Sequence, residues 1–97
     1  MYTVKMVFEY DSEKSMRNKV KHGIDFEEAQ ALWTDTDALI ISARSDTEPR
    51  FMVLGKRFLL WATFVPCMGE AVRIISVRRA RKPEVKKYEE TLISRRT

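Results

Sequence analysis

Three β-rich runs dominate the second half of the chain, and their connections are too short for anything except a reversal of direction. The runs cover residues 50–56, 58–65 and 71–78 and are rich in aromatic, β-branched and other apolar side chains. The second connection, residues 66–69, contains both proline and glycine and so reads as a turn. Strands joined by such short links pair as antiparallel neighbours, and the sequence therefore predicts an antiparallel sheet.

A first helix is expected over residues 12–21. Asp11 precedes it and can accept hydrogen bonds from the free N–H groups of the first turn, whereas Gly23 supplies the left-handed residue that ends a helix. Met16 and Val20 stand one turn apart, which places both on one apolar face. The remaining positions of this helix are mostly charged and are expected to face solvent.

A second helix starts immediately afterwards. Asp25 and Glu28 have the spacing of a capping box, in which each side chain accepts from the other residue's backbone N–H group. An apolar stripe follows at helical spacing and is formed by Phe26, Ala29, Leu32 and Trp33. Because Trp33 lies in this stripe and Trp61 in an apolar strand, both are expected in the core and not as base-stacking platforms.

The remaining segments complete the expected order. Alternating apolar residues predict a strand over residues 3–10, and apolar residues at spacing i, i+3 and i+7 predict a C-terminal helix over about 83–94. The short apolar piece 38–41 fits either an edge strand or a packed loop. The order β-α-α-β-β-β-α predicts a single α+β domain, residues 1–97, in which helices cover one face of an antiparallel sheet.

The composition excludes several classes of protein. With 44% hydrophobic and 33% charged residues, the chain has the balance of one small soluble domain, and no apolar run is long enough for a membrane span. We therefore expect a cytoplasmic protein without membrane contact. One cysteine, Cys67, and one histidine, His22, cannot form a disulfide framework or a zinc site, and the three glycines are too dispersed for a phosphate-binding loop.

Charge is distributed unevenly along the sequence. Residues 1–49 carry six basic and ten acidic side chains, whereas residues 50–97 carry twelve and four, so the two halves have formal charges of −4 and +8. Residues 73–87 alone hold seven basic side chains and one acid, Glu84. Such a run is either the solvated face of a helix or an attractive surface for phosphate, and nucleic acid is the first partner to consider.

The basic residues are also the candidates for chemistry. RNA carries its own nucleophile, the 2'-OH group, so a metal-free ribonuclease needs only a base, an acid and cations around the phosphorane. Lys21 and His22 at the end of the first helix could transfer protons, although a basic residue there also favours the helix dipole. No metal or cofactor is expected.

Three arginines in the last β-rich run or directly at its end could supply the cations. Strand alternation predicts Arg73 and Arg79 on one face, and Arg78 on the other with Val72 and Ile74. Arg78 and Arg79 can therefore join one site only if the strand ends or bulges between them.

Several segments together resemble the BrnT family of bacterial type II toxins. The resemblance covers residues 8–33, 48–56 and 72–90 in order and spacing. Its most specific pieces are Tyr10-Asp11 with Asn18, Lys21-His22-Gly23-Ile24, Arg50-Phe51 with Gly55, and Arg73-Ile74-Ile75-Ser76 with Arg78. The family more often has a glycine-containing turn at the position of Lys56-Arg57-Phe58 in this chain.

The resemblance implies a RelE-like fold and a ribonuclease toxin. It also implies a BrnA-type antitoxin with a ribbon-helix-helix domain, through which alone the complex would bind operator DNA. By similarity, the candidate active-site residues are Lys21, His22, Arg73, Arg78 and Arg79. The residues expected to bind RNA are Arg50, Lys56, Arg57, Arg81 and Lys82.

Two other functions fit the same basic surface. A non-catalytic nucleic-acid-binding or regulatory module would use it for phosphate contacts alone, with binding that weakens steeply as salt rises. A protein-interaction partner would instead present it to an acidic segment of another chain. RNA cleavage, RNA binding without cleavage, and protein binding without RNA affinity distinguish the three hypotheses.

Overall fold

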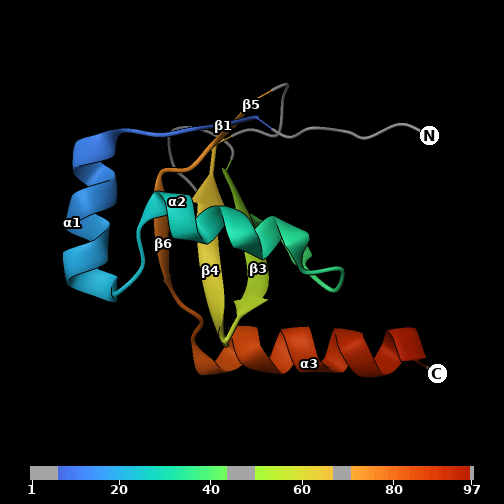
Figure 1. Cartoon of the computed structure of the whole chain (residues 1–97). Coiled ribbons are helices and arrows are strands. Elements are labelled where there is room, and N and C mark those ends of the chain that lie inside the picture. The colour runs from blue at the N-terminus through green and yellow to red at the C-terminus, as the bar shows by residue number, and fades with distance from the viewer. Residues whose placement is uncertain (1–6, 44–49, 67–70, 97) are drawn as a thin grey trace.

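The computed structural model describes residues 7–43, 50–66 and 71–96 (Figure 1). Positions 3–6 of the expected first strand and most of the expected turn, including Cys67, lie outside these residues. The elements are β1 (Val7–Glu9), α1 (Ser12–His22), α2 (Phe26–Ala29), the 3-10 helix η1 (Gln30–Thr34), β2 (Leu39–Ala43), β3 (Arg50–Arg57), β4 (Leu59–Val65), β5 (Ala71–Arg73), β6 (Ser76–Arg79) and α3 (Lys82–Arg96). The predicted α+β class is confirmed.

The strands form two sheets. An antiparallel sheet has the order β2-β3-β4-β6, and β1 and β5 form a separate parallel pair. The apolar piece 38–41, for which two interpretations stayed open, contributes to β2, which is an edge strand of the larger sheet among the described residues. The predicted antiparallel sheet is therefore present, with one more strand than the sequence pattern settled.

The prediction of a single strand over residues 71–78 is wrong, because this segment forms two strands that belong to different sheets. The Ile74 N–H group donates to the Glu9 carbonyl (3.0 Å), whereas the next N–H group, of Ile75, donates to the Phe64 carbonyl (3.0 Å). The chain thus leaves β1 and joins β4 within one residue. Two strands that belong to different sheets cannot share one register.

This break also changes which side chains share a face. Val72 and Ile74 are buried, but the next fully buried residue is Val77, so the alternation changes phase within the break. Ile74 and Val77 consequently pack in the same core cluster. The predicted grouping of Arg73 with Arg79 on one face, and of Arg78 with Val72 and Ile74 on the other, fails for this reason.

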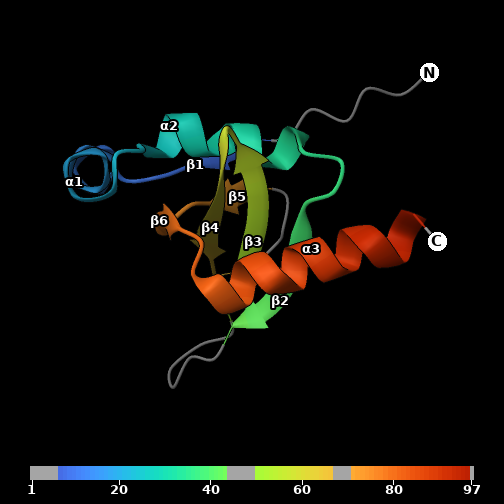
Figure 2. The same cartoon turned by 90° about the horizontal axis from the view of Figure 1, so that it is seen from below.

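Helices cover both faces of the larger sheet, so the prediction of a single covered face is also wrong (Figure 2). One cluster joins the α2 and η1 side chains to Trp61 and Val77, and the other joins Tyr88 of α3 to Leu54 and Ala62. Consecutive apolar residues of the central strands, such as Trp61 and Ala62, are buried on opposite faces of the sheet. A sheet of that kind needs a cover on each side.

The ends of α1 follow the sequence prediction, but its faces do not. Asp11 Oδ1 accepts from two backbone N–H groups at the start, and Gly23 adopts φ 80° at the end. Met16 and Val20, expected on the apolar face, are 70% and 90% exposed. Buried Ser15 faces inward instead and accepts a hydrogen bond from the Phe26 N–H group (2.9 Å). The helix is therefore held by polar contacts.

The second helical start is as predicted. Asp25 Oδ1 accepts from the Glu28 N–H group (2.7 Å), and Glu28 Oε1 accepts from the Asp25 N–H group (3.1 Å), which completes the capping box. Trp61 is buried, and Trp33 packs half-buried against the same cluster. Both tryptophans are thus core residues, as expected.

Gly55 allows η1 to lie directly on β3. A Cβ atom at Gly55 would lie 2.7 Å from the Leu32 Cβ atom and 2.8 Å from the Leu32 carbonyl oxygen. Both residues are completely or almost completely buried, so the helix cannot move away without opening the core. Only glycine fits this approach of helix to strand.

A tight turn joins β3 to β4, with Phe58 between the paired residues Arg57 and Leu59. Phe58 has φ 62°, the left-handed conformation that glycine adopts without strain, and its side chain is 88% exposed. A glycine at this position would take the same backbone conformation without strain.

Candidate active site

Helix α1 runs beside β6 at one edge of the larger sheet (Figure 1). A basic pocket opens between them. Its volume is about 330 Å³. Four basic side chains from α1 surround it, and we call it the α1 pocket. Its lining residues are Lys14, Arg17, Asn18, Lys21, His22, Phe26, Ile75 and Ser76.

Asn18 fixes α1 against the sheet and thereby sets the shape of this pocket. Its Nδ2 group donates to the carbonyls of Ile24 (2.8 Å) and Val77 (2.9 Å), and its Oδ1 atom accepts from the Val77 N–H group (3.5 Å). The amide thus pairs with the edge of β6 much as another strand would. These bonds also fix the positions of Lys14, Lys21 and His22, which lie one helical turn from Asn18 and line the pocket.

The pocket combines predicted residues with residues that sequence reasoning missed. Lys21 and His22 were expected at a site, whereas Lys14 and Arg17 were not. The spacing of Lys14, Arg17 and Lys21 is i, i+3 and i+7, which places three cations on one helix face. That signal was present in the sequence, but it reads equally as a solvated face until the neighbouring strand is known.

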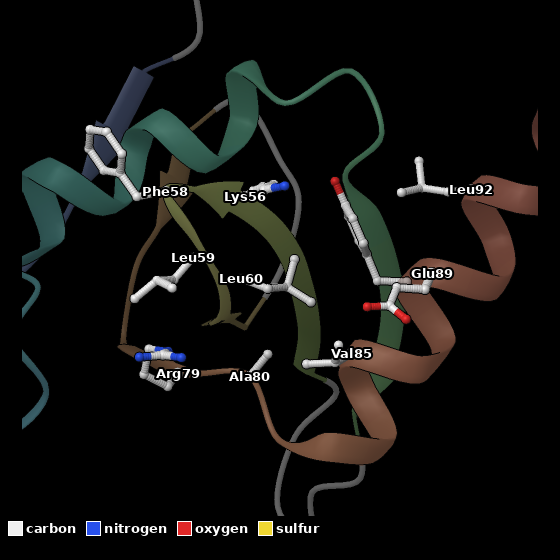
Figure 3. A pocket seen from close by; sticks show the side chains of 10 residues that line it. Lys56, Phe58, Leu59, Leu60, Arg79, Ala80, Val85, Glu89 and Leu92 are labelled. Carbon is white, nitrogen blue, oxygen red and sulfur yellow. The ribbon is translucent and has the colours of Figure 1, made fainter.

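A second opening separates α3 from the sheet and the β3–β4 turn (Figure 3). Its volume is about 340 Å³, its walls are largely aliphatic, and we call it the α3 groove. It is lined by Lys56, Phe58, Leu59, Leu60, Arg79, Ala80, Val85, Tyr88, Glu89 and Leu92. Two predicted cations, Lys56 and Arg79, thus lie at the same opening.

Arg79 occupies the end of β6 beside the core tryptophan. Its Cζ atom lies 5.7 Å from the centroid of the Trp61 ring, within cation–π range. The neighbouring Arg57 guanidinium lies 3.7 Å from a Glu28 carboxylate oxygen and 5.6 Å from the Phe58 ring centroid. Both arginines therefore lie at the end of the sheet where the β3–β4 turn projects.

Arg78 points to the opposite side, and three of its N–H groups already donate hydrogen bonds within the protein. Two of its N–H groups donate to the two Glu84 carboxylate oxygens, each at 2.8 Å, and its guanidinium lies 5.2 Å from the Phe64 ring centroid. The hydrogen bonds from Arg78 lower the pKa of Glu84, and the same pair raises the pKa of Arg78. This geometry attaches α3 to β6.

The other predicted residues are dispersed. Arg73 is exposed in β5 and lies 4.0 Å from Glu9 on β1. The Nε atom of Arg50 is buried without a hydrogen-bond partner among the described residues. Arg81 and Lys82 are exposed at the start of α3. The five predicted catalytic residues thus do not converge, because only Lys21 and His22 share a pocket.

The Tyr88 hydroxyl at the α3 groove holds two parts of the fold together. It donates a 2.6 Å hydrogen bond to Asp35 Oδ2, and burial and this carboxylate together raise its pKa far above the ordinary value of 10.0. Burial acts to raise the pKa of Asp35, but hydrogen bonds from Tyr88 and from two backbone N–H groups outweigh it and lower that pKa. The pair connects α3 to the loop before β2.

The described residues contain neither a metal-binding cluster nor a membrane-spanning helix. Among the described residues, no three His, Cys, Asp or Glu side chains gather as they would around a metal ion. No helix in the same part of the chain has the length and apolar character that crossing a membrane requires.

The fold and the α1 pocket define a small α+β protein with a basic, imidazole-containing site. Comparison with protein families matches residues 10–84 to the family described as the ribonuclease toxin, BrnT, of type II toxin-antitoxin systems. The chain therefore belongs to the BrnT family of ribonuclease toxins, and a protein antitoxin is the partner of such a toxin.

A solved structure supports the same assignment. The 1.1 Å crystal structure of the Brucella abortus ribonuclease toxin BrnT superimposes with a TM-score of 0.61 at 25% sequence identity, covering 80% of this chain and all of that one. A search of curated proteins gave no significant match.

Proposed function

We propose that this chain is a metal-independent endoribonuclease that cleaves RNA by attack of the 2'-OH group, and that the α1 pocket is its catalytic centre. The observation that carries the assignment of the site is the gathering of Lys14, Arg17, Lys21 and His22 around one opening. A base, an acid and cations are the complete set that this transesterification requires.

The reaction divides naturally among these side chains. His22 or Lys21, in its neutral form, takes the proton from the 2'-OH group as O2' attacks phosphorus. The other residue, protonated, gives a proton to the departing 5'-oxygen, so the products are a 2',3'-cyclic phosphate and a free 5'-OH group. Arg17 and Lys14 stabilise the negative charge that develops on the phosphorane oxygens. Arg73, Arg78 and Arg79 then act outside this centre, and the exposed Arg73 and Arg79 contact flanking phosphates.

The RNA backbone has further contacts available along the rest of the basic surface. Arg50, Lys56, Arg57, Arg81 and Lys82 remain proposed RNA-binding residues. Phosphate contacts position a strand without reading its sequence. Each alanine substitution among the exposed members should weaken RNA binding similarly for all sequences and reduce its salt dependence.

The test uses a long RNA incubated with purified protein in EDTA. We expect fragments ending in 2',3'-cyclic phosphate. The cleavage rate of His22→Gln should be lower than that of wild type by a factor of at least about 100. A site whose nucleotide lacks the 2'-OH group should not be cleaved. Circular dichroism of the variant confirms that it is folded. Bound but intact RNA would instead favour a regulatory module that binds nucleic acid without cleaving it.

We propose further that the antitoxin is of the BrnA type, with a ribbon-helix-helix domain that carries all operator binding, and that both proteins act in the cytoplasm. The test is co-expression with the protein encoded by the adjacent gene. We expect a stable complex that no longer cleaves RNA and that binds operator DNA only when the partner is present. A toxin that binds the operator alone would contradict this assignment.

A further inference from the structure

Three charged side chains without an ion pair to any described residue lie at the α3 groove, and one of them, Arg79, is in cation–π range of Trp61. Among the described residues, Lys56, Arg79 and Glu89 form no ion pair, although ion pairs involve many of their neighbours. All three side chains line the same opening of about 340 Å³. Figure 3 shows the Glu89 carboxylate projecting from α3 toward the strands, with Lys56 and Arg79 on the sheet side.

Apart from the Tyr88 hydroxyl, the rest of the groove is apolar and lies on two sides of these charges. Leu59 and Leu60 of β4 form one wall, and Val85 and Leu92 of α3 form the other. Two apolar walls of this kind can hold a planar ring between them. The volume of the groove lies at the lower end of the range typical of small-molecule sites. A single nucleotide, and not an extended chain, matches that size.

The turn beside the groove adds an aromatic surface. Phe58 is 88% exposed and holds a left-handed φ of 62°, a strain that is common at functional sites. An exposed aromatic ring flanked by cations is the usual platform on which a base of single-stranded RNA stacks. In Figure 3 the ring points away from the slot, where it would meet the next base along the strand.

We propose that the α3 groove binds one unstacked guanine nucleotide of the RNA substrate, with Glu89 as the residue that selects the base. The base lies between Leu60 and Val85, and Glu89 accepts from the N1–H and N2–H groups of guanine. Lys56 and Arg79 contact the adjacent phosphates. Adenine offers no such pair of donors to a carboxylate, so the groove discriminates between the two purines. This inference rests on the proposed function, because it takes RNA as the substrate.

The test is an NMR titration of the intact chain with 5'-GMP, 5'-AMP and 5'-UMP. We expect 5'-GMP to shift the amide resonances around Leu60, Ala80 and Glu89, with an affinity about tenfold higher than that of 5'-AMP. Glu89→Gln should bring 5'-GMP binding down to the level of 5'-AMP. Glu90→Gln is the matched control, since Glu90 is exposed on the same helix and pairs with Lys86.

Three results would overturn the proposal: equal binding of the two purines, unchanged selectivity in Glu89→Gln, or groove resonances that move only when the antitoxin is added. The last result would make the groove a protein docking site. Since the titration needs no cleavage, selective 5'-GMP binding by a chain that leaves RNA intact would support the groove and contradict only the proposed function. Cleavage without base selectivity would contradict only the groove.

Discussion

The two faces of the four-stranded sheet are built differently. On the α2 side, η1 lies directly on β3 at Gly55, and Asn18 links α1 to β6 by backbone hydrogen bonds. On the α3 side, the helix stands away from the strands and leaves a groove of about 340 Å³. Tyr88 packs on Leu54 and Ala62, and polar links at the edges, Arg78 with Glu84 and Tyr88 with Asp35, also hold α3 in place.

The difference in packing indicates that the α2 side contributes mainly to the stability of the fold and the α3 side mainly to ligand binding. A close-packed face tolerates almost no change in volume, whereas a face held at its margins by polar pairs keeps an opening for a ligand. We therefore expect substitutions on the α2 side to reduce stability most. On the α3 side they should act mainly through pH or on RNA binding.

The largest effect is expected for Gly55→Ala, because the added Cβ atom would overlap Leu32. We expect a loss of about 2–3 kcal/mol in the free energy of unfolding, measured by urea denaturation. The matched change on the α3 side is Ala80→Val, whose added methyl groups enter the groove and should cost less than about 1 kcal/mol. Equal losses for the two variants would show that the faces are packed alike.

Asn18→Ala is expected to cost about 2 kcal/mol, because it leaves carbonyl groups of Ile24 and Val77 without their donor. Lys19→Ala is the control on the same helix. It removes only the ion pair with Glu28, whose lysine is half exposed, and should change the free energy of unfolding by less than about 0.5 kcal/mol. If the control is as destabilising as Asn18→Ala, the amide bridge is not what fixes α1.

Acid should weaken the attachment of α3. Arg78 holds the pKa of Glu84 below its ordinary value of 4.5 in the folded protein. The unfolded chain therefore takes up a proton on Glu84 first as the pH falls below that value, so the stabilisation is complete above it and is lost toward lower pH. We expect the stability difference between wild type and Glu84→Gln to shrink between about pH 7 and pH 3. A constant difference would contradict the pair's role.

The smallest effect concerns the β3–β4 turn. Phe58→Gly removes the strain of a left-handed φ without loss of packing, since the ring is almost fully exposed. We expect a gain of about 0.5 kcal/mol, reduced by the larger conformational entropy of glycine in the unfolded chain. Phe58→Ala keeps the strain and should give no gain. A glycine variant less stable than the alanine variant would contradict this expectation, because it would show that the strain relieved at this position is smaller than the entropy cost of glycine.

Local signals predicted local structure well. Asp11, Gly23 and the Asp25–Glu28 pair begin and end helices where their side-chain chemistry predicts. What failed depended on distant partners. The division of residues 71–78 is set by β1 and β4, and the inward face of α1 is set by polar contacts of Ser15 and Asn18 that helical periodicity does not reveal.

The candidate site follows the same rule. Lys21 and His22 could be chosen from sequence because they are adjacent, whereas Lys14 and Arg17 become site residues only beside β6. Arg78 has a side chain that can bind phosphate, yet Glu84, six positions later, accepts two of its hydrogen bonds. No sequence pattern placed Glu89 at the same opening as Lys56, because that opening forms only where α3 packs against the β3–β4 hairpin.

Single-turnover RNA cleavage in EDTA by wild type and by two double variants tests most directly whether the α1 pocket is the catalytic centre. Arg17→Ala with Lys21→Ala removes two cations from the α1 pocket. Lys86→Ala with Lys87→Ala removes the same charge from exposed positions of α3. We expect a rate at least about 100-fold lower for the first variant and within about threefold of wild type for the second. Equal rates for the two variants would place the chemistry elsewhere on the molecule.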